Sequence, residues 1–118
     1  MITNPSAAEL TEALAAFDAS ATDARATFLA RVADNARATL EREAALGPAA
    51  EAAGVARLKA LLGEDGDFSA LNAALCARLR DGRLSPLDPA LLAHLKASAI
   101  DRIAIDQPSY SGLAALCE

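Results

Sequence analysis

Hydrophobic residues recur along most of the chain at steps of three and four residues, the spacing that places them on one face of an α-helix. Each of these amphipathic stretches is bounded by residues that start or stop helices, and no useful length alternates with the two-residue period of a β-strand. The pattern predicts five helices, at residues 6–18, 23–46, 48–63, 67–81 and 88–107. The tail after them is turn-like and then predicted to be helical again at Leu113–Cys117.

The helix boundaries rest on individual residues. Ser6 and Glu9 have the spacing of a capping box, in which each side chain accepts a hydrogen bond from the other residue's backbone N–H. Gly47 followed by Pro48 predicts a break, because glycine accepts the left-handed cap conformation and proline cannot continue the hydrogen-bond ladder. The other boundary signals are Gly63, Asp67, Gly82 and Asp88 with Pro89.

One apolar stripe per helix is predicted to be buried. The residues of these stripes, in chain order, are Leu10, Leu14, Phe17, Phe28, Val32, Ala36, Leu40, Val55, Leu58, Leu62, Phe68, Leu71, Leu75, Leu79, Leu92, Leu95, Ala99 and Ile103. The chain has 118 residues, a length that fits one domain. The predicted fold is therefore all-α: a compact bundle of about five helices with short connections and a C-terminal tail, forming a single domain over residues 1–118.

Composition and charge narrow the function classes. Alanine dominates the apolar residues and forms helices readily but has little surface to bury, so we expect a thin core that recruits a second copy and forms a homodimer. The formal net charge of −5 argues against nucleic acid as a partner. The N-terminus lacks a signal-peptide pattern and no uncharged segment is long enough to span a membrane, so we expect a cytoplasmic protein with no membrane partner.

Candidate chemistry is sparse. His94, Ser98 and Asp101 share a helix face and supply the residue types of a hydrolase, but a serine in mid-helix lacks free N–H donors for an oxyanion; we expect His94 at the edge of the apolar stripe instead. Cys76 is more natural as a small core residue than as a nucleophile, and Cys117 is distant from it in sequence. The turn at residues 64–67 resembles only the start of a calcium loop. We therefore predict no catalytic, cofactor or metal site.

Two polar sets remain as candidate sites. The first is Arg31, Asn35 and Arg42, with Glu43 beside Arg42: either a structural network, in which Asn35 bridges to another helix or the tail and Arg42 pairs with a carboxylate, or a surface for a partner or an anionic ligand. The second is the segment from Asp106 to Tyr110, where the tyrosine either anchors the tail or takes part in recognition.

Several motifs together resemble a bacterial family of small uncharacterised helical proteins that carry a domain of unknown function. The motifs are Pro5–Leu10, Arg31–Asn35, Glu41–Gly47, Leu71–Arg78, Asp88–Leu95 and Asp106–Tyr110. Gln107 replaces the asparagine usual in that family, and residues 19–27 look divergent. Members tend to be encoded beside aminoglycoside-phosphotransferase-like kinases and acyl-CoA dehydrogenases. The resemblance implies an accessory role in acyl-CoA or hydroxy-acid catabolism and carries over no catalytic residue.

The leading expectation is therefore a non-enzymatic interaction protein that binds a kinase-like enzyme or an acyl-CoA dehydrogenase of such a pathway, using exposed Ala/Leu surface with Arg31 and Arg42. The alternative is a helical protein that binds a small ligand, an acyl chain or acyl-CoA, in an apolar cavity with an arginine at its mouth.

Overall fold

A computed structural model of the chain describes residues 3–17 and 24–118. This part of the chain forms five α-helices and no β-strand, which confirms the predicted all-α bundle with a C-terminal tail. The helices are α1 (Ala7–Ala15), α2 (Ala24–Leu62), α3 (Phe68–Arg80), α4 (Pro89–Asp106) and α5 (Leu113–Cys117). The connection predicted at residues 19–22, and the adjoining predicted helix ends at residues 18 and 23, lie outside the described residues.

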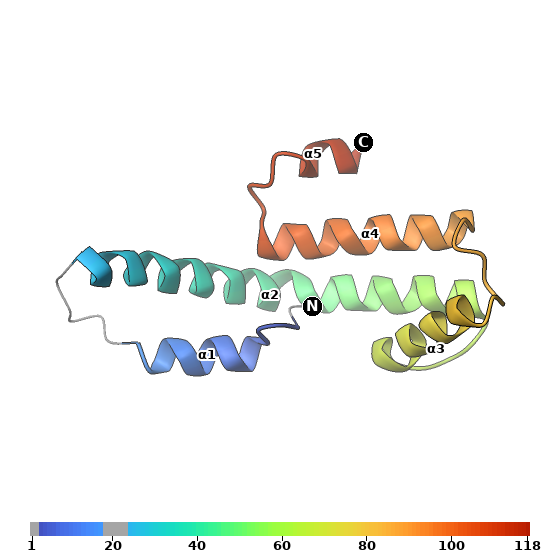
Figure 1. The fold of residues 1–118 in the computed structure, drawn as a ribbon, viewed down its shortest axis with the longest axis horizontal. Coiled ribbons are helices and arrows are strands. Elements are labelled where there is room, and N and C mark those ends of the chain that lie inside the picture. Colours follow the sequence, from blue (N-terminus) through green and yellow to red (C-terminus); the bar gives the residue numbers. More distant parts are fainter. Residues whose placement is uncertain (1–2, 18–23) are drawn as a thin grey trace.

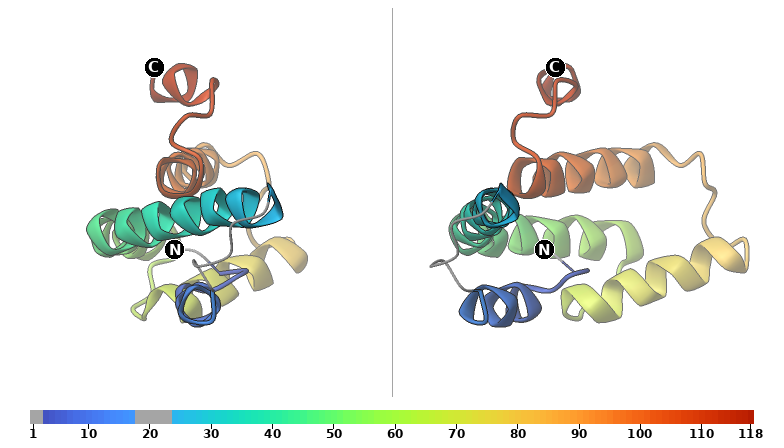
Figure 2. Two further views of the ribbon diagram at one scale, coloured as in Figure 1. Left: turned by 90° about the vertical axis from the view of Figure 1, so that its left-hand side faces the viewer. Right: turned by 60° about the vertical axis from the view of Figure 1, so that its left-hand side comes forward.

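The long helix α2 is the centre of the bundle. Helices α1 and α3 pack along one side of it, α4 packs on the other side, and α5 lies on the outer side of α4 (Figures 1 and 2). The molecule is elongated, with extents of 57 × 29 × 24 Å, and α2 sets its long axis. None of the helices in the described ranges combines the length and apolar character needed to cross a membrane.

The predicted break at Gly47–Pro48 is wrong. Helix α2 continues through both residues to Leu62, so the second and third predicted helices are one helix of 39 residues. Pro48 is exposed, so its ring lies at the surface of α2, and the helix continues without the hydrogen bond that its missing N–H would have donated to the Ala44 carbonyl. Contacts with α1, α3 and α4 on both sides of the proline hold the two halves in line. Tertiary packing thus overrides a strong local stop signal.

The other boundary signals are confirmed in detail. The Ser6 backbone N–H donates to Glu9 Oε2 at 2.7 Å and the Glu9 N–H donates to Ser6 Oγ at 3.3 Å, completing the predicted capping box of α1. Asp67 Oδ1 accepts from the Ala70 N–H at 2.8 Å and caps α3. Asp88 Oδ1 accepts from two N–H groups at the start of α4, whose first residue is Pro89.

The best-buried cluster lies where α2, α3 and α4 meet. Its buried members are Leu58, Leu62, Leu71, Leu75 and Leu91. The ring of Phe68 closes this cluster against α2: a Cβ added to Gly54 would lie 2.9 Å from Phe68 Cε2, so a glycine is what allows this approach. The predicted stripes at residues 55–62 and 68–79 are therefore the core of the molecule.

Two other predicted stripes are not buried. Phe28 and Val32, near the start of α2, are 65% and 50% exposed, because α4 ends before it reaches them. Leu92 and Leu95 of α4 are each 48% exposed. The face of α4 that packs on α2 instead carries the buried residues Leu91, His94 and Ile105. In both helices an apolar pattern was present, but the elements needed to cover it are absent from the described part of the chain.

Candidate functional site

Arg42 forms a polar joint between α2 and the end of α4. Its Nε donates to the Ile105 carbonyl oxygen at 2.6 Å, and its Nη2 donates to Thr39 Oγ1 at 3.0 Å. The Ile105 carbonyl belongs to the last turn of α4, where carbonyls have no partner within the helix and the helix dipole is negative. Arg42 therefore supplies both a donor and a positive charge to this helix end. The predicted carboxylate partner is replaced by a backbone carbonyl.

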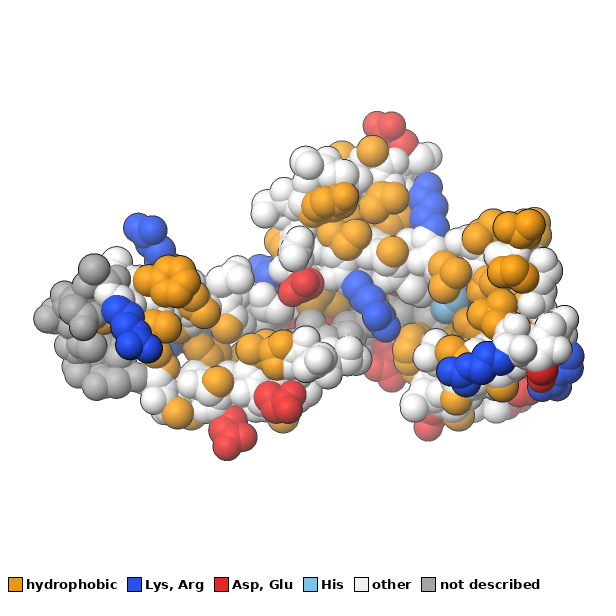
Figure 3. Space-filling model, viewed as in Figure 1, with side chains coloured by type: hydrophobic (Ala, Val, Ile, Leu, Met, Phe, Trp, Pro, Cys, Tyr) orange, Lys and Arg blue, Asp and Glu red, His pale blue; other side chains and the backbone are white. Residues whose placement is uncertain are grey.

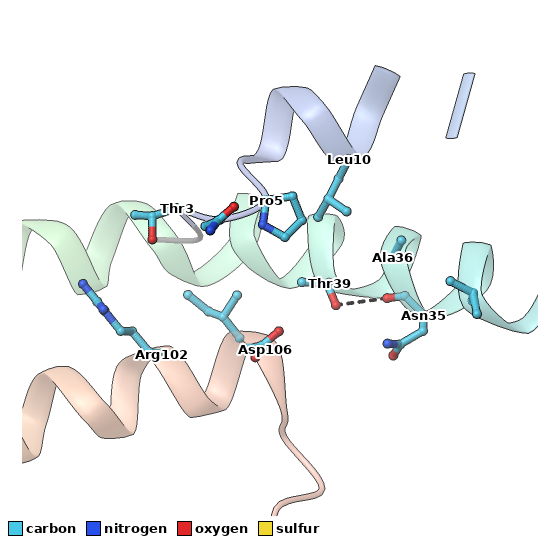
Figure 4. A pocket seen from close by; sticks show the side chains of 11 residues that line it. Thr3, Pro5, Leu10, Asn35, Ala36, Thr39, Arg102 and Asp106 are labelled. Carbon is cyan, nitrogen blue, oxygen red and sulfur yellow. Dashed lines mark hydrogen bonds between the residues drawn. The ribbon is translucent and has the colours of Figure 1, made fainter. Parts of the chain in front are cut away.

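Thr39 and Asn35 continue this joint along α2. Thr39 is buried, and its hydroxyl donates to the Asn35 carbonyl oxygen at 3.0 Å (Figure 4). The same hydroxyl accepts from Arg42. Asn35 thus takes part in the network through its main chain, whereas its side chain is exposed. Sequence reasoning missed Thr39, although a hydroxyl four residues after an asparagine and three before an arginine is the spacing such a helix-face network needs.

Three of the four predicted site residues surround one open cavity at the corner between α2 and the α4–α5 turn. Its volume is about 540 Å³. It is lined by Asn35, Arg42, Asp106, Gln107, Pro108, Ser109, Tyr110 and Ser111. The structure therefore brings Asn35, Arg42 and Tyr110 together, along with the rest of the second predicted polar set. Arg31 is exposed on α2 and does not line this cavity.

Tyr110 stabilises the turn in which it lies. Its ring covers Gly112, because a Cβ at that position would come within 2.6 Å of Tyr110 Cε1. Its N–H donates to the Gln107 carbonyl at 2.9 Å, and its own carbonyl accepts from Leu113 at 3.0 Å. The tyrosine is nevertheless 51% exposed, so the ring anchors the start of α5 locally and leaves one face open to the cavity.

A second cavity adjoins the first on the other side of Asn35. It has a volume of about 380 Å³ and lies between the segment leading into α1, the middle of α2 and the end of α4 (Figure 4). Its apolar lining includes Pro5, Leu10, Val32 and Ile105. Its polar lining includes Thr3, Asn4, Asn35, Thr39, Arg102 and Asp106. Asn35 and Asp106 line both cavities, so the α2–α4 joint separates two neighbouring hollows.

We expect Arg42→Ala to lower the free energy of unfolding by about 1–3 kcal/mol, since it leaves the Ile105 carbonyl and the buried Thr39 hydroxyl without their donor. Asn35→Ala is the matched control on the same helix and should change stability by less than about 0.5 kcal/mol, because the alanine retains the carbonyl that Thr39 uses. Denaturant titration of both variants measures the difference. Equal losses would mean that the network does not depend on the arginine.

A buried polar cluster joins α2 and α4 farther along. His94 is 4% exposed rather than at the stripe edge, and its Nδ1 accepts from Arg57 Nε at 3.4 Å. Arg57 Nη2 also reaches Asp101 Oδ2 at 3.2 Å. In a hydrolase triad the carboxylate would accept from the histidine, whereas here Arg57 lies between them. Sequence reasoning missed Arg57; its place one residue before buried Leu58 was the available signal.

This cluster predicts a pH-dependent stability. Burial lowers the pKa of His94 below its usual value of 6.5, and the positive charge of Arg57 lowers that pKa further. The unfolded chain therefore takes up a proton near pH 6.5 that the folded chain does not, so stability is complete above that pH and declines below it. The melting temperature should be lower at about pH 5.5 than at about pH 7.5.

His94→Gln is the control for this pH effect, because His94 is the only histidine of the chain. The difference in melting temperature between the two pH values should become smaller in the variant. An unchanged difference would assign the effect to other groups.

The remaining candidates have structural partners. In the turn at residues 64–67, Asp67 caps α3, Asp65 pairs with Lys59 at 2.8 Å, and Glu64 pairs with Arg78. Cys76 is half-buried on α3, and Cys117 is an exposed thiol on α5. Across residues 3–17 and 24–118, no three His, Cys, Asp or Glu side chains are grouped so as to hold a metal ion.

The fold and these joints define an all-α protein built around one long central helix. The chain belongs to the family described as domain of unknown function DUF6285, whose sequence profile matches residues 20–110. The matched region contains α2, α3 and α4, together with the Arg42 joint and the Arg57 cluster between α2 and α4. It excludes α1 and α5. Neither the curated proteins nor the solved structures that were compared with the chain gave a match.

Proposed function

We propose that this protein is a cytoplasmic, non-enzymatic interaction protein that forms a homodimer and binds an enzyme of an acyl-CoA or hydroxy-acid catabolic pathway. The observation that supports an interaction role is the large surface of the protein and the apolar side chains exposed on it. The accessible area is 7746 Å², whereas a compact monomer of 12.1 kDa exposes about 6,000 Å². The difference of about 1,700 Å² reflects the elongated shape, in which the helices expose surface that a compact bundle would bury.

Apart from Leu46 and Tyr110, the large exposed apolar side chains of the described residues gather at two places. One is the overhang surface, formed by Phe28, Leu29 and Val32 near the start of α2. The other is the α4 surface, formed by Leu87, Leu92 and Leu95. Hydrophobic side chains are visible over both ends of the elongated molecule (Figure 3). Exposed apolar clusters on a small helical protein are characteristic of docking sites.

We assign the pathway enzyme to the α4 surface and the second copy to the overhang surface. The resemblance of the chain to proteins encoded beside aminoglycoside-phosphotransferase-like kinases and acyl-CoA dehydrogenases names the two candidate enzymes. Of the two arginines expected to contact a partner, Arg31 is exposed on α2 and remains available, whereas Arg42 is hydrogen-bonded to the end of α4.

Co-purification tests the enzyme contact. Tagged protein should retain one of the two neighbouring enzymes when they are co-expressed, and Leu92→Asp with Leu95→Asp should abolish retention without lowering the melting temperature by more than a few degrees. Lys96→Asp is the matched control, because it introduces the same carboxylate at an exposed position of the same helix. Retention of neither enzyme by the unaltered protein would contradict the proposal.

A second candidate function is binding of an acyl chain or acyl-CoA. It is favoured by the cavity of about 380 Å³, where Leu10, Val32 and Ile105 provide apolar lining and Arg102 provides a positive charge for a phosphate or carboxylate. A ligand bound only by the folded state must raise the melting temperature. A thermal-shift series of acyl-CoAs of increasing chain length should therefore produce a rise that Arg102→Ala reduces, and a flat series would exclude this function.

A further inference from the structure

Helix α2 extends well past the end of α4. The contacts of Arg42 with Ile105 and of Arg57 with His94 fix the antiparallel register of the two helices. Because α4 ends at Asp106, residues 24–41 of α2 continue beyond it. At 1.5 Å per residue this overhang is about 27 Å long. Helix α1 packs along it on one side, and none of the described helices lies on the side that α4 would cover (Figures 1 and 2).

The open side continues the face of α2 that α4 buries. Counting back from buried Thr39, the same face carries Asn35, Val32 and Phe28 at steps of four, three and four residues. Phe28 and Val32 have large exposed fractions of 65% and 50%, although their spacing is that of a helix–helix seam. From Asn35 to Phe28 this face therefore extends for about two turns without a partner helix among the described residues.

We infer that a second copy of this chain supplies that partner, with the two overhangs packed antiparallel about a two-fold axis at Val32. A two-fold contact requires one patch to be complementary to itself. With Val32 on the axis, Phe28, one turn before it, lies opposite Ala36, one turn after it on the other copy. Ala36 lines the cavity of about 380 Å³, so each phenylalanine faces a hollow of the other copy.

The charges of the two surfaces agree with this arrangement. Arg25, one turn before Phe28, is exposed and would approach Asp106, which lines the same cavity of the other copy. An acyl ligand in that cavity would compete with this contact, so the two cannot occupy it together.

This inference rests on the homodimer of the proposed function, and disulfide trapping tests it directly. Packed helix axes lie about 8–10 Å apart and each Cα lies about 2.3 Å from its axis, which leaves about 3.4–5.4 Å between the two Cα atoms at the two-fold axis. A disulfide spans such a distance. In a Cys76→Ser, Cys117→Ser background, Val32→Cys should therefore form a covalent dimer under mild oxidation.

Leu92→Cys in the same background is the control, since it is equally exposed but lies on α4. It should stay uncrosslinked under the same conditions. Val32→Asp should convert the unmodified dimer to a monomer that keeps its helical circular dichroism, because Val32 is half-exposed within one subunit. Equal crosslinking of both cysteine variants, or a Val32→Asp protein that remains dimeric, would overturn the inference.

A failure of the proposed dimer contact at the overhang can be distinguished from a failure of the proposed function. If the Val32→Asp protein stays dimeric and still retains the pathway enzyme, the overhang is not the dimer surface but the interaction role stands. If the unaltered protein is a monomer and Val32→Asp loses the enzyme, the overhang binds the enzyme, and the second copy is excluded as its occupant.

Discussion

Leu58→Ala should unfold the molecule more readily than any other single truncation of the bundle core. Leu58 has no exposed surface and belongs to the buried cluster at which α2, α3 and α4 meet, so its truncation opens a cavity at that junction. Leucine-to-alanine changes at such sites cost about 2–5 kcal/mol, through lost burial and the cavity left behind. Thermal denaturation followed by circular dichroism should show a melting temperature lower by more than about 10 °C.

Leu87→Ala is the matched control for this experiment. The same atoms are removed, but Leu87 is 78% exposed and lies in the loop before α4. Its stability should change by less than about 0.5 kcal/mol. Similar losses in the two variants would mean that the meeting point of the three helices is not the core of the fold.

Pro48→Ala should make the protein more stable. In a continuous α2, proline at this position removes one hydrogen bond to the Ala44 carbonyl and crowds that carbonyl, and alanine corrects both defects. The proline penalty in a helix interior is about 3 kcal/mol. Because the surrounding structure has adjusted to the proline, alanine should recover all or part of this penalty, and we expect a gain of about 1–3 kcal/mol in the free energy of unfolding. Denaturant titration of the variant measures this gain.

The result discriminates between two structures of this segment. If the chain instead turned at Gly47–Pro48, the proline would preorganise the start of the second helix, and alanine would be neutral or destabilising. Pro89→Ala provides that comparison within the same chain. Pro89 is the first residue of α4, where proline is favourable, so its replacement should cost stability while the replacement of Pro48 adds it.

Most helix ends of this fold follow from the sequence, since they depend on local chemistry. The caps at Ser6, Asp67 and Asp88 form the predicted hydrogen bonds. Gly63 and Gly82 adopt the left-handed conformation, with φ of 68° and 76°, at the ends of α2 and α3. Gly47–Pro48 carries the same kind of signal, but the outcome there depends on α1, α3 and α4 packing along both halves of α2, which no local pattern reports.

The buried face of α4 shows a second limit of hydrophobic periodicity. The apolar positions Leu92 and Leu95 predicted one face, while the helix buries the face carrying His94 and, half-buried, Asp101. Those polar residues are tolerated there because Arg57 from α2 contacts both. A pairing between residues 37 and 44 positions apart is invisible to a pattern within one helix.

The candidate site was also only partly predictable, because some of its contacts join residues that are far apart in the sequence. Asn35 was singled out because it borders an apolar stripe, Arg42 because it lies on the same predicted helix, and Tyr110 because it lies in a proline- and glycine-containing turn. The fold places all three around one cavity. The partner of Arg42, the Ile105 carbonyl, was not predictable, because backbone acceptors at helix ends become available only where one helix ends against another. Arg31 lies one turn away from this cavity, on a part of α2 that α4 does not reach.

We expect association of two copies to cover the apolar surface of the α2 overhang. Light scattering on a size-exclusion column, at micromolar concentration and moderate salt, measures this most directly. The expected mass is twice the 12.1 kDa of one chain, falling to the mass of one chain for Val32→Asp. A mass of 12.1 kDa for the unaltered protein across the whole concentration range would contradict the account.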